Sequence, residues 1–348
     1  MREWEKNIRR VVPYTPGEQP KNKNVIKLNT NENPYPPSPK VLACRERIDD
    51  LNLYPDPAIS DLVNALATYH GVDPSNVFVG VGSDDVLAMC FLTFFNGDLP
   101  IVFPDITYSF YDVWAELYRI QYRTIALDDD FKMLPEDYQV PNGGVVFPNP
   151  NAPTGVLMGL DDVRKIIEAN RDVIVIVDEA YIDFGGESAL PLIDEYDNLI
   201  VVRTFSKSRS LAGLRIGYCM ANEELIKALN DVKYSFNSYT LSRPAILMGK
   251  ASVEDDTYFK ETCKKVIATR EYFENELKRL GFTFPESKTN FVFVSHNKVS
   301  AKVIFDKAKE NGIILRYFEK PRIDNYLRIT IGTDEEMKKL VDFLESIL

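Results

Sequence analysis

Two patterns of apolar and polar residues alternate along much of the chain. Short runs that are apolar on both faces recur between residues 76 and 221, as in "NVFVG", "IVFP", "VVFP" and "VIVIVD". The segments between them, such as 60–71 and 160–171, read as helices, and the second has the spacing of an amphipathic helix. Strands that are buried on both faces and joined by helices are typical of a mostly parallel sheet between two helical layers. We therefore expect an α/β fold.

The pattern changes on both sides of this region. Residues 13–39 are rich in proline and asparagine and predict an irregular arm. From about residue 222 the chain becomes helical to about residue 280, and strands at 290–296, 314–318 and 326–332 precede a last helix at 334–348. We expect a large domain over residues 45–245. Residues 1–44 and 246–348 would form the arm and a smaller α/β domain.

Composition narrows the class of protein. The 348 residues are 45% apolar and 27% charged, which is ordinary for a soluble globular protein. The net charge of −11 makes nonspecific binding to nucleic acid or to an anionic membrane a poor hypothesis. Any phosphate must therefore be held by local cations and backbone N–H groups.

Cysteine, histidine and apolar runs exclude further classes. The four cysteines form no CxxC pair and there are two histidines, so neither a disulfide framework nor a zinc site is expected. The charged N-terminus has no apolar signal-peptide core, and no apolar run approaches the roughly 20 residues that span a bilayer. We expect a cytoplasmic protein without a metal.

Polar residues gather where the predicted strands end. In an open parallel sheet, ligands bind just beyond the carboxyl ends of the strands. Each such residue alone has an ordinary explanation as a helix cap, a turn or a surface loop. Four polar clusters at one edge of a sheet indicate a ligand instead. The residues concerned are Ser83, Asp84, Asn149, Asn151, Asp178, Ser206 and Lys207.

The chemistry of this set points to one ligand. A lysine amine forms an imine with an aldehyde. A carboxylate beside a pyridine nitrogen keeps that nitrogen protonated, and the ring then draws electrons. Hydroxyl groups, helix N–H groups and an arginine hold a phosphate, and an aromatic side chain stacks on the ring. Together these requirements describe pyridoxal 5′-phosphate.

Eight motifs carry a resemblance to a known family. In chain order they are "LNTNENP", "YPDP", "VGSDD", "TYSFY", "PNAPTG", "VDEAYIDF", "RTFSKSRSLAGLRIGY" and "YLRITIGT". The chain resembles the fold-type I pyridoxal-phosphate-dependent aminotransferases, and within them the histidinol-phosphate aminotransferases. The resemblance runs from about Tyr14 to Gly332, and its most specific string is S-K-x(4)-A-G-L-R-x-G.

The resemblance implies a role for each matching residue. Lys207 corresponds to the lysine that joins the cofactor and then moves a proton at the substrate. Asp178 corresponds to the partner of the ring nitrogen, and Tyr181 to the donor to the cofactor's phenolate oxygen. The remaining cofactor contacts implied are Tyr108 stacked on the ring, and Ser83, Asp84, Ser206 and Arg215 at the phosphate.

Two further implications concern the partner subunit and a departure from the family. Tyr54 matches a tyrosine that reaches the cofactor phosphate of the partner subunit, so the resemblance implies a homodimer. The family commonly has asparagine immediately before Pro-Thr-Gly, where this chain has Ala152. We expect Asn151, one residue earlier, to supply the amide.

The resemblance also implies a substrate site. Arg328 matches an arginine that binds the substrate's carboxylate or phosphate, Arg316 would add a second cation, and Tyr14 would close over the phosphate. Asn33 and Asn237 are weaker candidates.

The implied reaction is the transfer of an amino group between L-histidinol phosphate and 2-oxoglutarate. Imidazole-acetol phosphate and glutamate complete this ping-pong cycle of histidine biosynthesis. A threonine-phosphate decarboxylase and a broad aromatic-amino-acid aminotransferase are the alternatives within the cofactor class. A non-catalytic binding protein on the same fold is the remote one, and the presence of Lys207, Asp178 and Arg215 argues against it.

Overall fold

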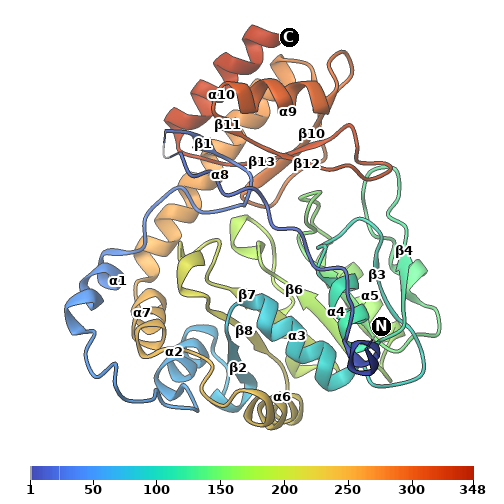
Figure 1. Ribbon diagram of the computed structural model, residues 1–348, viewed down its shortest axis with the longest axis vertical. Coiled ribbons are helices and arrows are strands. Elements are labelled where there is room, and N and C mark those ends of the chain that lie inside the picture. Colours follow the sequence, from blue (N-terminus) through green and yellow to red (C-terminus); the bar gives the residue numbers. More distant parts are fainter. Residues whose placement is uncertain (1, 23) are drawn as a thin grey trace.

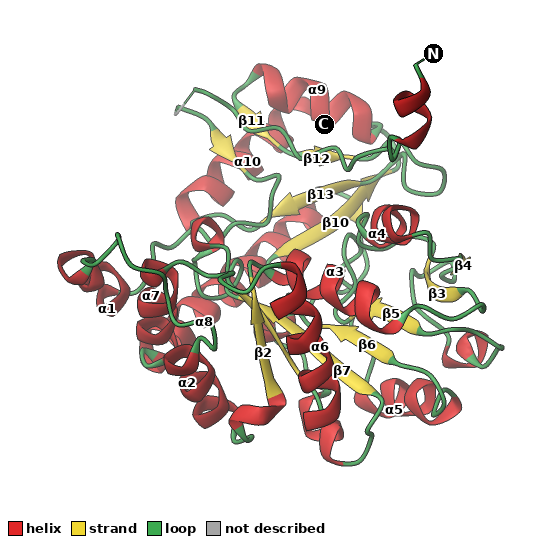
Figure 2. Ribbon diagram, turned by 60° about the horizontal axis from the view of Figure 1, so that its bottom comes forward, coloured by secondary structure: helices red, strands yellow, loops and turns green. Residues whose placement is uncertain are grey.

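A seven-stranded sheet forms the centre of the larger part of the molecule (Figures 1 and 2). The structure is a computed structural model, which describes residues 2–22 and 24–348. The strands lie in the order β2-β8-β7-β6-β5-β3-β4. All neighbours from β7 to β4 pair in parallel and β8 runs antiparallel to both of its neighbours, which confirms the mostly parallel sheet. The strands are β2 (Val77–Gly80), β3 (Ile101–Pro104), β4 (Tyr122–Ile125), β5 (Val145–Pro148), β6 (Val175–Asp178), β7 (Leu199–Thr204) and β8 (Gly217–Met220).

Helices cover both faces of this sheet, because successive strand residues point to opposite sides. On β5, Val146 packs in one apolar cluster and its neighbour Phe147 in the other. The cluster with Phe147 includes α2 (Ser60–His70), α5 (Leu160–Ala169) and α7 (Arg243–Val253). The cluster with Val146 includes α3 (Ser83–Phe94), α4 (Tyr111–Tyr118) and α6 (Glu223–Phe236).

The smaller part is built on an antiparallel sheet in the order β12-β13-β10-β9. Three helices pack with it around a separate apolar cluster, and the long helix α8 extends from the larger part to the smaller one (Figure 1). The elements are α8 (Asp256–Arg279), β9 (Phe282–Thr283), β10 (Phe291–His296), α9 (Ala301–Glu310), β12 (Arg316–Tyr317), β13 (Leu327–Thr330) and α10 (Asp334–Ile347).

The N-terminal region touches both parts. Arg9 and Tyr14 lie against α4, where Arg9 donates to the Leu117 carbonyl and the Tyr14 ring stacks on Phe110 with their centres 4.2 Å apart. Further along the chain, β1 (Ile26–Lys27) pairs in parallel with β11 (Ile313–Ile314) of the smaller part. The short helix α1 (Pro39–Ala43) then leads into the larger part. The arm therefore runs across the space between the two sheets.

One predicted strand is divided in the structure. Residues 314–318 were expected to form a single strand, but β11 pairs with β1 whereas β12 pairs with β13. The two short strands belong to different sheets, so the chain changes partner at Leu315. The prediction of one continuous strand was wrong because an apolar run does not reveal which neighbour each residue meets.

Helix ends follow local sequence signals. Gly71 ends α2 in the left-handed conformation (φ 71°), and its N–H donates to the Ala67 carbonyl. Thr333 begins α10 with a capping box, in which its hydroxyl accepts from Glu336 N–H and the Glu336 carboxylate accepts in return. Among the described residues, no helix is both long and apolar enough to cross a membrane.

Candidate active site

A cavity of about 160 Å³ opens at the carboxyl ends of β6 and β7, beside the first turn of α3. Asp178 is the last residue of β6, and Ser206 and Lys207 follow the end of β7. The structure thus brings together residues that were predicted separately at strand ends. The predicted residues that line the cavity are Ser83, Asp84, Tyr108, Asp178, Tyr181, Ser206, Lys207 and Arg215.

Asp178 is a buried carboxyl group with no cation beside it among the described residues. Its side chain is 4% exposed, and it accepts hydrogen bonds of 3.1 Å from the Tyr111 hydroxyl and from Ala180 N–H. Burial raises the pKa of Asp178 to about 7, although these hydrogen bonds favour the charged form. The carboxylate is therefore suited to a positively charged group inside the cavity.

Lys207 projects from a loop that is held on both sides. The Asn33 amide donates to the Lys207 carbonyl at 3.0 Å and to the Ser208 carbonyl at 3.2 Å. The Ser208 hydroxyl donates to Asp183 at 2.6 Å. The Lys207 amine itself donates to the Thr30 carbonyl at 3.2 Å and lies 5.8 Å from the centre of the Tyr181 ring. The loop fixes the base of the side chain and leaves its amine at the cavity.

Arg215 and the start of α3 form an anion cradle. Arg215 donates to the Ser206 hydroxyl at 3.4 Å and pairs with Asp84 at 3.1 Å. A side chain at Gly82 would place its Cβ 2.5 Å from the Arg215 guanidinium, so only glycine leaves room for the arginine over the helix N-terminus. Backbone N–H groups at that end of a helix favour an anion.

Tyr108 is held firmly against the cavity. Its hydroxyl donates to Asp84 at 2.6 Å, and its ring meets Tyr111 edge-on at 5.8 Å. Burial and the neighbouring Asp84 raise the pKa of Tyr108 well above its usual range, so the phenol stays neutral. A rigid, uncharged aromatic ring therefore lines this side.

Arg316 and Arg328 lie directly opposite each other on β12 and β13. Both guanidinium groups lie beside the Phe318 ring, with the guanidinium carbon 5.5 Å (Arg316) and 5.9 Å (Arg328) from the ring centre. Arg328 donates to the Asn29 carbonyl at 2.9 Å, and burial lowers its pKa, as does Arg316. Neither arginine pairs with a carboxylate within the described ranges. Like charges in such register repel each other, so an anion between them would stabilise the pair.

Three predicted residues lie elsewhere or have other partners. The Asn151 amide donates to the Ile106 carbonyl and to the Thr154 hydroxyl, both at 3.0 Å, so both of its N–H bonds have partners outside the cavity. Its neighbour Ala152 lines the cavity instead. Asn33 supports the Lys207 loop, as described above. Asn237 lies exposed at the end of α6, away from the cavity.

Tyr54 is also outside the cavity of its own chain. Its side chain is 77% exposed and its ring stacks on Tyr239 at 4.6 Å. Arg243 donates to the Tyr54 carbonyl at 3.1 Å. The residue therefore stands on the surface, where another molecule could receive it.

Sequence reasoning missed several residues of the cavity wall, such as Thr30 and Glu32, and two residues that hold predicted side chains. Tyr111 holds Asp178, and Asn31 donates to the Tyr181 hydroxyl at 2.9 Å. Tyr111 follows Tyr108 by three residues in "TYSFY", a spacing that indicates a shared direction at a helix start. Asn31 stands in "LNTNENP", where nothing distinguishes it from the other asparagines.

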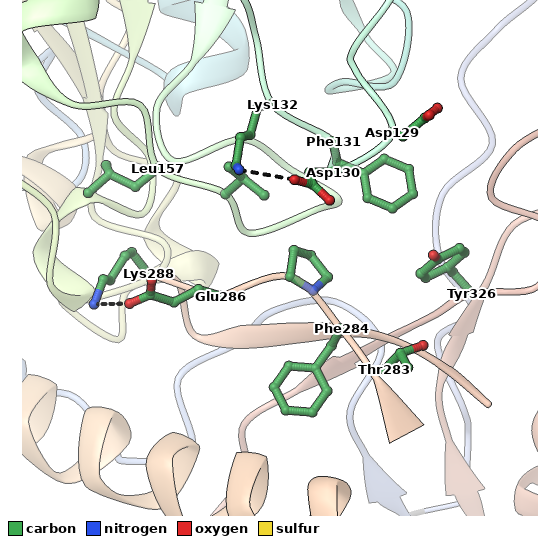
Figure 3. A pocket seen from close by; sticks show the side chains of 12 residues that line it. Asp129, Asp130, Phe131, Lys132, Leu157, Thr283, Phe284, Glu286, Lys288 and Tyr326 are labelled. Carbon is green, nitrogen blue, oxygen red and sulfur yellow. Dashed lines mark hydrogen bonds and ion pairs between the residues drawn. The ribbon is translucent and has the colours of Figure 1, made fainter. Parts of the chain in front are cut away.

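A second and larger hollow, of about 510 Å³, lies between the segments 129–132 and 283–288 (Figure 3). Its two lysines already have acidic partners, with Lys132 paired to Asp130 at 3.1 Å and Lys288 to Glu286 at 2.7 Å. Of the described charged residues that line it, only Asp129 has no ion-pair partner. No described arginine lines this hollow, so it lacks the anion cradle of the smaller cavity.

Known proteins resemble this chain over nearly its whole length. It is 52% identical to the histidinol-phosphate aminotransferase of Clostridium beijerinckii, with 99% of this chain and 97% of that protein covered. It is 53% identical to histidinol-phosphate aminotransferase 1 of Hydrogenovibrio crunogenus, with 99% and 98% covered.

Solved structures extend the comparison. The histidinol-phosphate aminotransferase of Sinorhizobium meliloti, in complex with pyridoxal-5′-phosphate, matches with a TM-score of 0.85 and 27% identity, over 93% of this chain and 92% of that one. The L-threonine-O-3-phosphate decarboxylase of Porphyromonas gingivalis matches with a TM-score of 0.78 over 92% and 99%. At 21% identity, that likeness shows the fold alone.

A family model covers the same ground. The model described as aminotransferase class I and II matches residues 23–344, which include every residue that lines the cavity. The sheet, the cavity at its carboxyl edge and the full-length relatives agree with this match. The chain belongs to the class I and II aminotransferase family.

Proposed function

We propose that this chain is a pyridoxal-phosphate-dependent aminotransferase that moves an amino group between L-histidinol phosphate and 2-oxoglutarate. It would serve histidine biosynthesis in the cytoplasm. The observation that carries the reaction type is the convergence of Lys207, Asp178 and the Arg215 cradle on one cavity. The relatives with 52% and 53% identity support the choice of substrates.

The described residues fit the cofactor at three points. The buried Asp178 carboxyl group has a raised pKa and gains from a protonated ring nitrogen beside it. Gly82 leaves the space over α3 in which Arg215 and Ser206 meet a phosphate. Among the described residues, the Lys207 amine has one hydrogen-bond partner, the Thr30 carbonyl, and it forms no ion pair, so it is available to an aldehyde. When bound, the cofactor supplies an electron sink for charge at the substrate's α-carbon.

Lys207 would act as the general base and acid. Its amine would remove the proton from the substrate's α-carbon and would return a proton to the cofactor carbon that came from the aldehyde group. The Asn33 and Ser208 contacts limit how far the lysine loop can move during this exchange. Asp178, held by Tyr111, would place its charge beside the ring nitrogen, and Tyr108, held by Asp84, would offer its face to the ring.

The Arg316–Arg328 pair would bind the far end of each substrate. A phosphate dianion accepts hydrogen bonds from two guanidinium groups, and its charge removes the repulsion between them. The distal carboxylate of 2-oxoglutarate would take the same place in the second half-reaction. Tyr14 stacks on Phe110 and lies near Arg328, where it opposes part of the lowering of the arginine's pKa by burial. It would cover the bound anion.

We also infer that two copies of the chain associate. Leu51, Leu53 and Tyr54 expose between 54% and 77% of their surface. Phe236, the last residue of α6, exposes 70%. An apolar patch of this kind is typical of a contact surface. In the dimer, Tyr54 of one subunit would reach the cofactor phosphate of the other.

Single-turnover spectroscopy tests the substrate. The cofactor-loaded protein is mixed in turn with histidinol phosphate, phosphothreonine and phenylalanine, and the rate of change of its absorbance is followed. We expect histidinol phosphate to react fastest, because its phosphate satisfies both Arg316 and Arg328 while its imidazole fills the pocket. A faster conversion with phosphothreonine would favour a decarboxylase, and with phenylalanine a broad aromatic aminotransferase.

A further inference from the structure

Asn31 uses all of its polar groups to join three separate segments. Its side chain is 1% exposed and its backbone is left-handed, with φ of 55°. Its N–H donates to the Thr330 hydroxyl at 3.0 Å, and its carbonyl accepts from the Asn290 amide at 3.0 Å. Its own amide donates to the Tyr181 hydroxyl at 2.9 Å. The residue is thus fixed against β13 while it contacts the active site.

The hydrogen-bond pattern determines which way the Asn31 amide faces. The Thr330 oxygen accepts the Asn31 N–H, and its hydroxyl proton has one acceptor among the described residues, the Asn31 side-chain oxygen 3.0 Å away. That arrangement leaves the amide N–H group for Tyr181. The Tyr181 oxygen is consequently an acceptor in this contact.

The Tyr181 proton must then point elsewhere. Its hydroxyl has no acceptor among the described residues, and its side chain lines the cavity. On the neighbouring wall, Ala152 has no polar side chain, and the Asn151 amide donates to Ile106 and Thr154. Tyr181 is therefore left as the neutral donor on this side of the cavity.

We propose that Asn31 is a positioning residue that turns the hydroxyl proton of Tyr181 into the cavity, toward the phenolate oxygen of the cofactor. This inference rests on the cofactor proposed above. Asn31 does not touch the cofactor and acts only through Tyr181. Arg328 lies on β13, as does Thr330, and it donates to the Asn29 carbonyl. The segment of Asn29 and Asn31 therefore contacts both Arg328 and Tyr181.

The test is a pH titration of the visible absorbance of the bound cofactor, without substrate. A donor to the phenolate oxygen stabilises the deprotonated chromophore, so Tyr181→Phe should raise the chromophore pKa by about one unit. Asn31→Gly keeps the left-handed backbone and removes the amide. We expect it to raise the chromophore pKa in the same direction, by a smaller amount.

The double variant distinguishes positioning from a general structural effect. Asn31→Gly should add nothing to the chromophore pKa in the Tyr181→Phe background, because its only route is through that hydroxyl. Asn290→Ala is the matched control: it removes the donor to the Asn31 carbonyl, and we expect it to lower the melting temperature of the cofactor-free protein without moving the chromophore pKa.

Each failure has its own meaning. If Tyr181→Phe shifts the chromophore pKa but Asn31→Gly leaves it unchanged, the inference about Asn31 is overturned and the proposed function stands. An equal shift from Asn31→Gly with and without Tyr181 also overturns it. If the parent protein binds no pyridoxal phosphate, the proposed function fails first.

Discussion

At the scale of single residues, three charged groups of the candidate site form no ion pair with any described residue, whereas Arg215 pairs with Asp84. Asp178 is buried with a raised pKa, Arg328 is buried with a lowered one, and Lys207 donates to a carbonyl group. Elsewhere, a buried charge such as that of Glu179 is neutralised by Arg203 at 2.9 Å. The contrast indicates that the charges of the site are complemented by ligands.

Lys207→Ala should abolish the absorbance of the cofactor-loaded protein near the edge of the visible range. The alanine has no amine to join the cofactor aldehyde, although the phosphate cradle at Arg215 remains. An absorbance spectrum of the purified variant, with added cofactor, measures this. Lys302→Ala, on the exposed side of α9, is the control and should retain the band. Persistence of the band in Lys207→Ala would contradict the assigned role.

The pH dependence of stability tests the burial of Asp178. In the cofactor-free protein, its pKa rises from 3.8 to about 7, so between these pH values the folded chain binds more protons than the unfolded chain. The free energy of unfolding therefore falls as pH rises. Asp178→Asn removes this loss, so we expect its stability relative to the parent to increase by a few kcal/mol from about pH 4 to about pH 7.

Urea unfolding of both cofactor-free proteins across this pH range gives the two free energies of unfolding. The variant must be compared with the parent because the titration of His70 also changes the stability of both proteins. Burial, with help from Arg203 and Arg209, lowers the pKa of His70 from 6.5 to about 3. Here the unfolded chain binds more protons, so stability rises with pH over a range that overlaps that of Asp178. The parent curve alone would conceal both slopes. A difference between the proteins that does not change with pH would count against a buried, protonated Asp178.

At the scale of elements, the site depends on how closely β8 approaches the first turn of α3. A Cβ on Gly217 would lie 2.2 Å from the backbone of Gly82 and Ser83, which cannot move aside like a flexible side chain. Strand and helix are thus packed backbone to backbone where the phosphate cradle begins. The N-terminus of α3 can take this position because Gly217, on β8, has no side chain.

Gly217→Ala should therefore weaken cofactor binding by displacing the start of α3 from Arg215. Titration of the cofactor-free protein with pyridoxal phosphate, followed by absorbance, gives the dissociation constant, which we expect to rise about tenfold or more. Gly213 lies in the turn that precedes β8, with open space around the position of a Cβ, so Gly213→Ala should bind the cofactor nearly as the parent does. Equal affinities for the two variants would show that the close approach has no role in the cradle.

The elements were largely predictable from the sequence, whereas the contacts between them were not. The run "VIVIVD" and the glycine after His70 fix β6 and the end of α2, because burial on both faces and a left-handed turn each leave a local signature. The partners of the Asn151 amide and the contact of Asn31 with Tyr181 could not be predicted, because an amide's partners come from segments distant in the sequence. The Arg316–Arg328 register likewise depends on a pairing that no local pattern specifies.

At the scale of the whole molecule, the exposed Tyr54 region predicts that one active site is built from two chains. Mixing Tyr54→Ala with Lys207→Ala should restore activity, because a mixed dimer contains one site with an intact lysine from one chain and an intact tyrosine from the other. Random exchange would give about a quarter of the sites in this intact form.

The experiment compares turnover of the mixture with that of each variant alone, after unfolding and refolding together to exchange subunits. Refolding each variant with itself controls for recovery of the protein. If the mixture is no more active than the mean of its components, Tyr54 does not act across subunits. Sedimentation of the same samples reports whether dimers formed at all.

The pairing of β1 with β11 has a consequence for the order in which the protein matures on the ribosome. Ile26 emerges early, yet its strand partner Ile313 is made near the end of synthesis. The large sheet has all of its strands once residue 220 has emerged, but the carbonyl of Thr30 and the amide of Asn31 reach Lys207 and Tyr181 only when β11 and β13 exist to receive them. A nascent chain can thus assemble the cradle for the cofactor's phosphate well before it completes the wall that faces the reacting amine.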